Sequence, residues 1–149
     1  MYHRILVPLE HSPTDVFILE HVRRLAHHLG SSLVLIHVAD GWAARNVDAL
    51  NLRESEEMRL DRDYLERLAT ELTTDGLSAE ALLASGDPAR EITAAAVRED
   101  CDLIAMATHG HKFIGDVVYG SVANAVRHET SIPVLLLRAP ATARNSPAS

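Results

Sequence analysis

Residues 102–126 read DLIAMATHGHKFIGDVVYGSVANAV: a short apolar run, a loop that contains glycine, and an amphipathic segment. The apolar run at 103–107 predicts a buried strand. The segment that opens at Gly120 and Ser121 predicts a helix with Val122, Ala125 and Val126 on its inward face. A strand, a loop and a helix in this order form the repeating unit of a parallel sheet covered by helices.

The same alternation runs through the rest of the chain. Apolar runs of strand length predict further strands at 5–8, 33–38, 79–84 and 134–137. Helical segments are predicted from Ser12 to Gly30, over 53–74, and from Asp87 to about Arg98. Five strands with four intervening helices indicate a doubly wound α/β fold with a parallel sheet buried on both faces.

The first helix carries recognisable end signals. Ser12 suits the N-cap, Pro13 the first helical position, Asp15 the acidic position of a capping box, and Gly30 the end. Spacings of three and four predict one apolar stripe against the sheet. This stripe is Val16, Leu19, Val22, Leu25, Ala26 and Leu29. The second helix shows a similar stripe in Met58, Leu65, Leu68, Ala69 and Leu72.

Two segments show no clear periodic pattern of apolar residues. Residues 41–52 contain the only tryptophan, and we interpret them as a mobile connection that could lie across a ligand cleft. Residues 139–149 (APATARNSPAS) are small and polar, and we expect a disordered tail. The sequence therefore predicts one domain over residues 1–138.

Composition narrows the classes of function. The chain has 149 residues, 47% hydrophobic content and a formal net charge of −7, with basic residues scattered, which disfavours nucleic-acid binding. Its apolar runs are far shorter than the roughly 20 residues of a membrane-spanning helix, so we expect no membrane segment. The single cysteine, Cys101, and the lack of a secretory h-region favour a cytoplasmic protein in which this thiol is structural.

The stretch from Met106 to Ser121 carries the strongest chemical signal. Nine residues separate Gly110 from Gly120, and both glycines are placed between a predicted strand and a predicted helix, where open α/β sheets bind ligands. Glycine lets backbone approach a phosphate closely, and amides at a helix N-terminus point toward it. Ser121 would add a hydroxyl donor. The spacing predicts a phosphate-binding site.

Several short motifs are spread over nearly all of residues 1–138. They are ILVP (5–8) with SP (12–13), LIHV (35–38), GDP (86–88) with EI (91–92), DLIAM (102–106), THG (108–110), GSVA (120–123) and IPV (132–134). Together they resemble the universal stress protein family, which has an opening ILVPxDxSP, an LLHV strand, GxPxxxI and DLIVMG motifs and a long C-terminal signature.

The resemblance implies a five-stranded parallel sheet of order 3-2-1-4-5, of the adenine nucleotide alpha-hydrolase-like type. It also implies binding of ATP or a related adenine nucleotide, with or without Mg²⁺, by a regulatory stress-response protein with at most slow ATP hydrolysis. The implied binding residues, by number in this sequence, are Pro8, Leu9 and Glu10 beside the ribose and adenine, Val38 and Met106 flanking the base, and Ala107, His109, Gly110, Gly120, Ser121 and Val122 around the phosphates.

Two positions depart from the family's pattern. Ala107 stands where a first glycine is usual, and its methyl group crowds the approach of a phosphate. Glu10 replaces an aspartate and moves the carboxylate outward by one methylene. The resemblance also implies a homodimer formed through the last strand, residues 133–138, at an open sheet edge.

The residues alone are also compatible with other functions. A ligand-free dimeric interaction module would use the same fold without the nucleotide. A catalyst would have only Glu10, His11, His109 and His111 as acid–base candidates. A metal bound by His109 and His111 with His11 is disfavoured, since two histidines in one loop are more often plain loop residues.

Overall fold

The computed structural model describes residues 1–40, 47–108 and 116–140. Strands and helices alternate along these residues, as the sequence predicts. The elements are β1 (Arg4–Pro8), α1 (Thr14–Leu29), β2 (Ser32–Asp40), α3 (Val47–Thr74), β3 (Ala79–Gly86), α4 (Pro88–Arg98), β4 (Leu103–Thr108), α5 (Asp116–Glu129) and β5 (Val134–Arg138).

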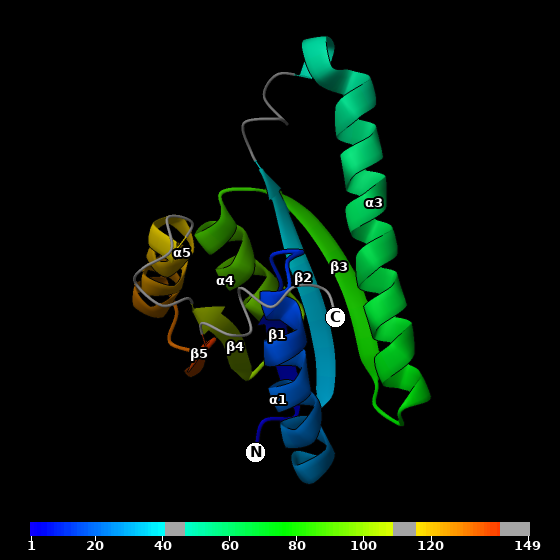
Figure 1. The fold of residues 1–149 in the computed structure, drawn as a ribbon. Helices are drawn as coiled ribbons and strands as arrows, with labels where there is room; N and C mark the ends of the chain where they lie inside the picture. Colours follow the sequence, from blue (N-terminus) through cyan, green and yellow to red (C-terminus); the bar gives the residue numbers. More distant parts are fainter. Residues whose placement is uncertain (41–46, 109–115, 141–149) are drawn as a thin grey trace.

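The five strands form one sheet in the order β3-β2-β1-β4-β5, and every neighbouring pair is parallel. The predicted strand order is confirmed. Helices α1 and α3 cover one face, and α4 and α5 cover the other (Figure 1). Because both faces are covered, the central strands are apolar at nearly every position, and Ile5, Leu6 and Val7 are all fully buried.

Helix α1 is rotated relative to the stripe that the sequence predicts. The residues it buries are Ile18, Val22 and Ala26 together with Thr14 and Asp15, whereas Val16 is 73% exposed and Leu29 is also exposed. The run VFIL at 16–19 is apolar throughout, so its period could not select the inward side. The predicted end is confirmed, because Gly30 closes the helix in the left-handed region with φ of 71°.

Two predicted helix starts are wrong. Helix α3 begins at Val47, so the irregular connection predicted at 41–52 is helical from 47 onward, and residues 41–46 lie outside the described ranges. Helix α5 begins at Asp116, four residues before Gly120, which therefore lies inside the helix. By contrast, α4 starts as predicted, with Asp87 as N-cap accepting a hydrogen bond from the Arg90 N–H and Pro88 following it.

The segment after β5 continues the packed domain for at least one residue. Ala139 is buried, and its N–H donates to the Thr108 carbonyl at 2.8 Å. This contradicts a disordered tail that begins at residue 139. Residues 141–149 lie outside the described ranges, and their predicted disorder stays a prediction.

Candidate functional site

The carboxyl ends of β1 and β2 border a small apolar cavity. The chain runs outward from β1 to β3 and then crosses to β4 on the other side of β1, so β1 lies at the switch point where open α/β sheets hold ligands. The cavity has a volume of about 160 Å³. It is lined by Pro8, Leu9, Glu10, Ile36, His37, Val38, Pro88, Ile92 and Val122.

Five residues predicted for the site line this cavity: Pro8, Leu9, Glu10, Val38 and Val122. They come from β1 and the loop after it, from β2 and from α5, so the fold assembles them from segments more than 80 residues apart. The ends of the first two strands therefore meet at one cavity, and their role in binding a ligand stays a prediction.

The other predicted site residues lie elsewhere. Met106 is fully buried in the core under α4 and α5, and Ala107 is buried against the opposite face, so neither lines the cavity. Gly120 and Ser121 lie in α5 outside the lining residues. His109 and Gly110 lie outside the described residues.

Four lining residues were missed by the sequence analysis. Ile36 and His37 belong to β2, and Pro88 and Ile92 belong to the first turns of α4. The position of Asp87 and Pro88 at a helix start directly after β3 was a usable signal, because helix N-termini meet the carboxyl edge of a parallel sheet. Nothing local distinguishes Ile36 from the other apolar residues of its strand.

A buried carboxylate shapes the loop after β1. Asp15 is 2% exposed, and its oxygens accept the backbone N–H groups of Glu10 (3.1 Å), His11 (2.9 Å) and Ser12 (3.2 Å). The Tyr64 hydroxyl of α3 donates to Asp15 at 2.6 Å. Asp15 therefore does more than cap a helix, because it fixes the backbone that borders the cavity.

The ionisation of this pair follows from its burial. Desolvation raises the pKa of Asp15, against the lowering effect of the hydrogen bonds from Tyr64 and the loop amides. Desolvation and the hydrogen bond to Asp15 raise the pKa of Tyr64 as well. Tyr64 therefore remains a protonated donor at neutral pH, and it supports the carboxylate from the α3 side.

Two histidines and one aspartate connect α3 to the cavity wall. Nδ1 of His37 lies 2.9 Å from the Leu9 carbonyl, which can only accept, so this nitrogen carries a proton. Nε2 of His37 faces Asp61 at 3.4 Å, and this contact is attractive only when the ring is protonated on both nitrogens. His11 contacts the other Asp61 oxygen at 2.6 Å and stacks on Tyr64 at 3.9 Å between ring centroids.

The carboxylate of Glu10 turns toward its own loop. The Ser12 hydroxyl donates to Glu10 Oε1 at 2.8 Å, and the same hydroxyl oxygen accepts the Thr14 N–H at 3.3 Å. Ser12 thus supports the start of α1, although the position directly before the helix is occupied by Pro13 and not by Ser12 as predicted. The longer side chain of glutamate reaches this hydroxyl and borders the cavity at the same time.

Among residues 1–40, 47–108 and 116–140, no three ligating side chains converge as a metal site would require. His109 and His111, which the metal hypothesis invokes, lie outside these ranges. No helix in the described parts of the chain has the length and hydropathy needed to cross a membrane.

Comparison with known proteins defines the family. The sequence matches the model of the Universal stress protein family over residues 1–138. Universal stress protein MJ0577 of Methanocaldococcus jannaschii is 26% identical over 155 residues, which cover 93% of this chain and 96% of that protein. A universal stress protein of Methanothermobacter thermautotrophicus is 30% identical over 144 residues, with 93% and 97% covered. The chain belongs to the universal stress protein family.

Solved structures agree with this membership. The structure of the hypothetical protein MJ0577 has a TM-score of 0.80 at 27% identity and covers 94% of this chain and 98% of that one. A universal stress protein in complex with cAMP (TM-score 0.66, 16% identity, 93% and 98% covered) and one from Archaeoglobus fulgidus in complex with dAMP (0.61, 19%, 91% and 97%) share the fold. Adenine nucleotides thus bind to proteins with this architecture.

Proposed function

We propose that this protein binds an adenine nucleotide, ATP or a related one, with the base in the cavity at the ends of β1 and β2. Apolar side chains from both sides, among them Ile36, Val38 and Ile92, suit the faces of a planar base. At about 160 Å³ the cavity is smaller than the roughly 300 Å³ of a typical ligand pocket, so it would hold the base while the phosphates lie outside it.

The phosphates would lie toward α5, near Gly120 and Ser121, with His109 and Gly110, which precede this helix in the sequence. Gly120 is the observation that carries this assignment. It lies inside a helix, where glycine costs about 1 kcal/mol relative to alanine, and it does not have positive φ. No atom of the described residues outside its own helix and chain neighbours lies within 4 Å of where a Cβ would stand. The packing described here does not require glycine, whereas close approach of a ligand would.

Isothermal titration with Mg-ATP and with AMP tests the assignment. Gly120→Val should abolish binding, because the branched side chain would occupy the space of the phosphates. Asn124→Val, an exposed position one turn later in α5, is the matched control and should bind like the unmodified protein. Equal heats for all three proteins, or loss in both variants, would contradict the site.

Ala107 provides a second test. Its replacement by glycine should tighten nucleotide binding modestly if its methyl group hinders the approach of a phosphate. Because Ala107 is buried, the stability of Ala107→Gly should be measured in parallel. Equal or weaker affinity in a folded variant would remove this explanation for the departure from the family's pattern.

The second candidate is a dimeric interaction module, and the edge strand favours dimer formation in either case. β5 lies at the end of the sheet, and Leu136 is 40% exposed. Antiparallel pairing of two β5 strands would satisfy both edges. Light scattering of Leu136→Lys should then report a monomer, and mass spectrometry of the purified protein for bound nucleotide separates the two functions. A cytoplasmic location, a role in stress response and at most slow hydrolysis stay predictions.

A further inference from the structure

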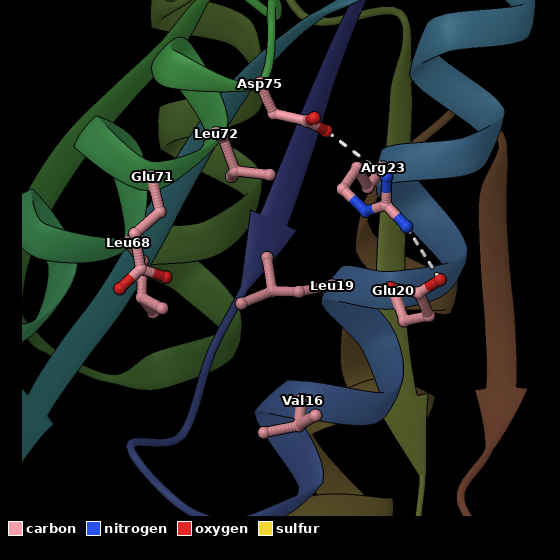
Figure 2. A pocket seen from close by; sticks show the side chains of 8 residues that line it. All are labelled: Val16, Leu19, Glu20, Arg23, Leu68, Glu71, Leu72 and Asp75. Carbon is pink, nitrogen blue, oxygen red and sulfur yellow. Dashed lines mark hydrogen bonds and ion pairs between the residues drawn. The ribbon is translucent and has the colours of Figure 1, made fainter.

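A groove separates the two helices on one face of the sheet. It has a volume of about 360 Å³ and lies between α1 and α3, with Arg23 reaching across toward Asp75 at one end (Figure 2). The groove is distinct from the nucleotide cavity and shares no lining residue with it. Its lining residues are Val16, Leu19, Glu20, Arg23, Leu68, Glu71, Leu72 and Asp75.

Polar bridges between the helices limit the length of the groove. At the carboxyl edge of the sheet, Tyr64 of α3 donates to Asp15 of α1. Toward the other edge, Arg23 (3.2 Å) and His27 (3.1 Å) of α1 contact Asp75 just beyond α3. Asp15 and Arg23 are eight positions apart, so the free length is about 12 Å, or roughly two helical turns.

The walls of the groove are apolar and come from both helices. Leu19 points from α1 toward Leu68 and Leu72 of α3 (Figure 2). Val16, which the period of α1 assigned to the core, instead lies at the groove with 73% of its surface exposed. An apolar side chain this exposed gains from burial only when another molecule covers it.

The rim of the groove is acidic. Three carboxylates, Glu20, Glu71 and Asp75, face one guanidinium, Arg23, which leaves two negative charges. Glu71 has no ion-pair partner among the described residues. The whole chain carries a net charge of −7, so a second copy of it would bring like charge to this rim.

We propose that this groove docks about two turns of an amphipathic helix from a basic partner protein. Apolar side chains at positions i, i+3 or i+4, and i+7 would enter between Leu19 and Leu68, beside Val16, and flanking lysine or arginine side chains would meet Glu71 and Glu20. The charge complementarity selects a basic partner over a second copy of this chain. Docking does not require nucleotide.

The test uses a fluorescent model peptide of about 14 residues, with leucine at these spacings and lysine on the opposite face. Fluorescence anisotropy with nucleotide-free protein should show saturable binding that weakens with added salt. Val16→Glu should weaken binding at least about tenfold, because it places a charge against the apolar anchors. Val97→Glu is the matched control, since Val97 is also 73% exposed and lies on α4, on the opposite face of the sheet.

Glu71→Lys should also weaken binding of the lysine peptide. The same variant should strengthen binding of a peptide in which glutamate replaces lysine. Equal loss in Val16→Glu and Val97→Glu, or equal binding of the two peptides, would overturn the proposal. So would self-association of the protein that Val16→Glu abolishes, since the occupant would then be a second copy. Circular dichroism confirms beforehand that each variant is folded.

Discussion

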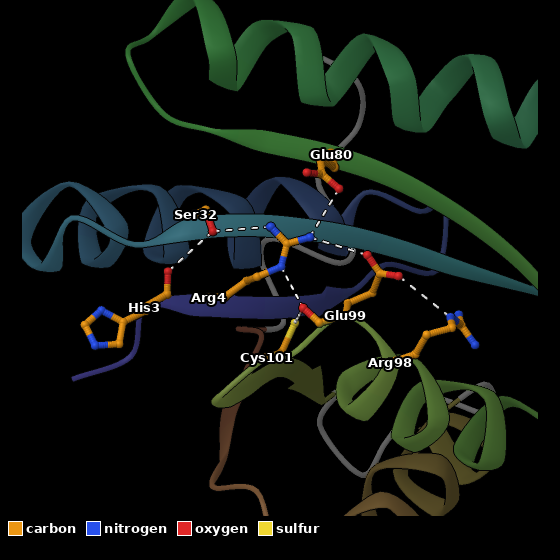
Figure 3. A network of polar contacts seen from close by, with 7 residues as sticks. All are labelled: His3, Arg4, Ser32, Glu80, Arg98, Glu99 and Cys101. Atoms are coloured by element: carbon orange, nitrogen blue, oxygen red, sulfur yellow. Dashed lines mark hydrogen bonds and ion pairs between the residues drawn. The ribbon is translucent and has the colours of Figure 1, made fainter.

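The two edges of the sheet hold their polar groups in different ways. At the carboxyl edge, Asp15 is sealed from water and accepts three loop amides and a tyrosine hydroxyl. At the amino edge, Arg4 contacts Glu80 (3.2 Å), Glu99 (3.4 Å) and the Glu99 carbonyl (2.8 Å), and these groups remain partly exposed (Figure 3). Asp102 accepts the N–H groups of His3 and Arg4 at the same edge.

The pKa directions reflect this difference. Burial raises the pKa of Asp15, whereas for Asp102 desolvation is outweighed by the hydrogen bonds from Arg4 and His3, and the pKa is lowered. Cys101 lies near the amino edge, where burial raises the pKa of its thiol to about 11, so the thiol stays protonated. The amino edge therefore gains stability from its charged groups, whereas at the carboxyl edge a desolvated carboxylate holds the backbone of the loop after β1.

The largest expected effect is that of Asp15→Ala. The variant leaves the amides of Glu10, His11 and Ser12 and the Tyr64 hydroxyl without their acceptor, so the free energy of unfolding should fall by about 3–4 kcal/mol. Asp102→Ala, which frees two partly exposed amides, should cost about 1 kcal/mol. Urea denaturation measures both. Similar losses at the two edges would contradict the comparison.

A smaller effect is expected for Arg4→Met, which keeps the aliphatic stem and removes the guanidinium. Its contacts with Glu80, Glu99 and the Glu99 carbonyl should contribute about 1–1.5 kcal/mol, partly screened by salt. Arg59→Met on α3 is the control, because its single exposed pair with Glu56 should contribute about 0.3 kcal/mol. Nucleotide affinity should not change in either variant, and a change in Arg4→Met would connect the amino edge to the site.

Tyr64→Phe should cost about 1 kcal/mol of stability, since it removes one hydrogen bond while Asp15 keeps its three amide donors. The aromatic ring and its stacking on His11 remain. If the loop conformation matters for the ligand, adenosine affinity measured by calorimetry should fall as well. An unchanged affinity together with the stability loss would limit Tyr64 to a structural role.

The smallest effect concerns pH and follows from the shifted pKa of one carboxyl group at each edge, Asp15 and Asp102. A raised pKa for Asp15 means that the folded state binds the proton more tightly than the unfolded state, so its contribution to stability increases as pH falls toward about 4. For Asp102 the pKa is lowered, and its contribution is present above about pH 4 and is lost as pH falls below it. Unfolding free energies from pH 7 to 3, relative to Asp15→Asn and Asp102→Asn, should therefore change in opposite directions.

Much of the fold could be predicted because strands buried on both faces have a distinctive composition. Runs such as 5–7 and 33–36 are apolar at consecutive positions, and no exposed helix or edge strand requires that. The Asp87 cap with Pro88 and the glycine at position 30 have short-range physical causes, and both were found from the sequence.

The predicted inward face of α1 and the predicted start of α5 were wrong because the local sequence allows more than one arrangement there. In α1, Val16 and Ile18 are both apolar, and only the packing of the folded chain shows that Ile18 enters the core while Val16 borders the groove. Gly120 looked like the start of a helix, but α5 begins four residues earlier, so this glycine lies in the helix interior.

Some features of the candidate site could likewise be predicted from the sequence, and others could not. The sequence by itself determined the parallel sheet, the family and the strand ends that meet at the cavity, because these follow from composition and contiguous motifs. Only the tertiary structure decided that Tyr64 of α3 contacts Asp15, 49 positions earlier in the chain. It also decided that Asp61 of α3 contacts His11 and His37, 50 and 24 positions earlier. Hydrogen bonds between side chains so far apart in the chain leave no local period or propensity from which they could be read.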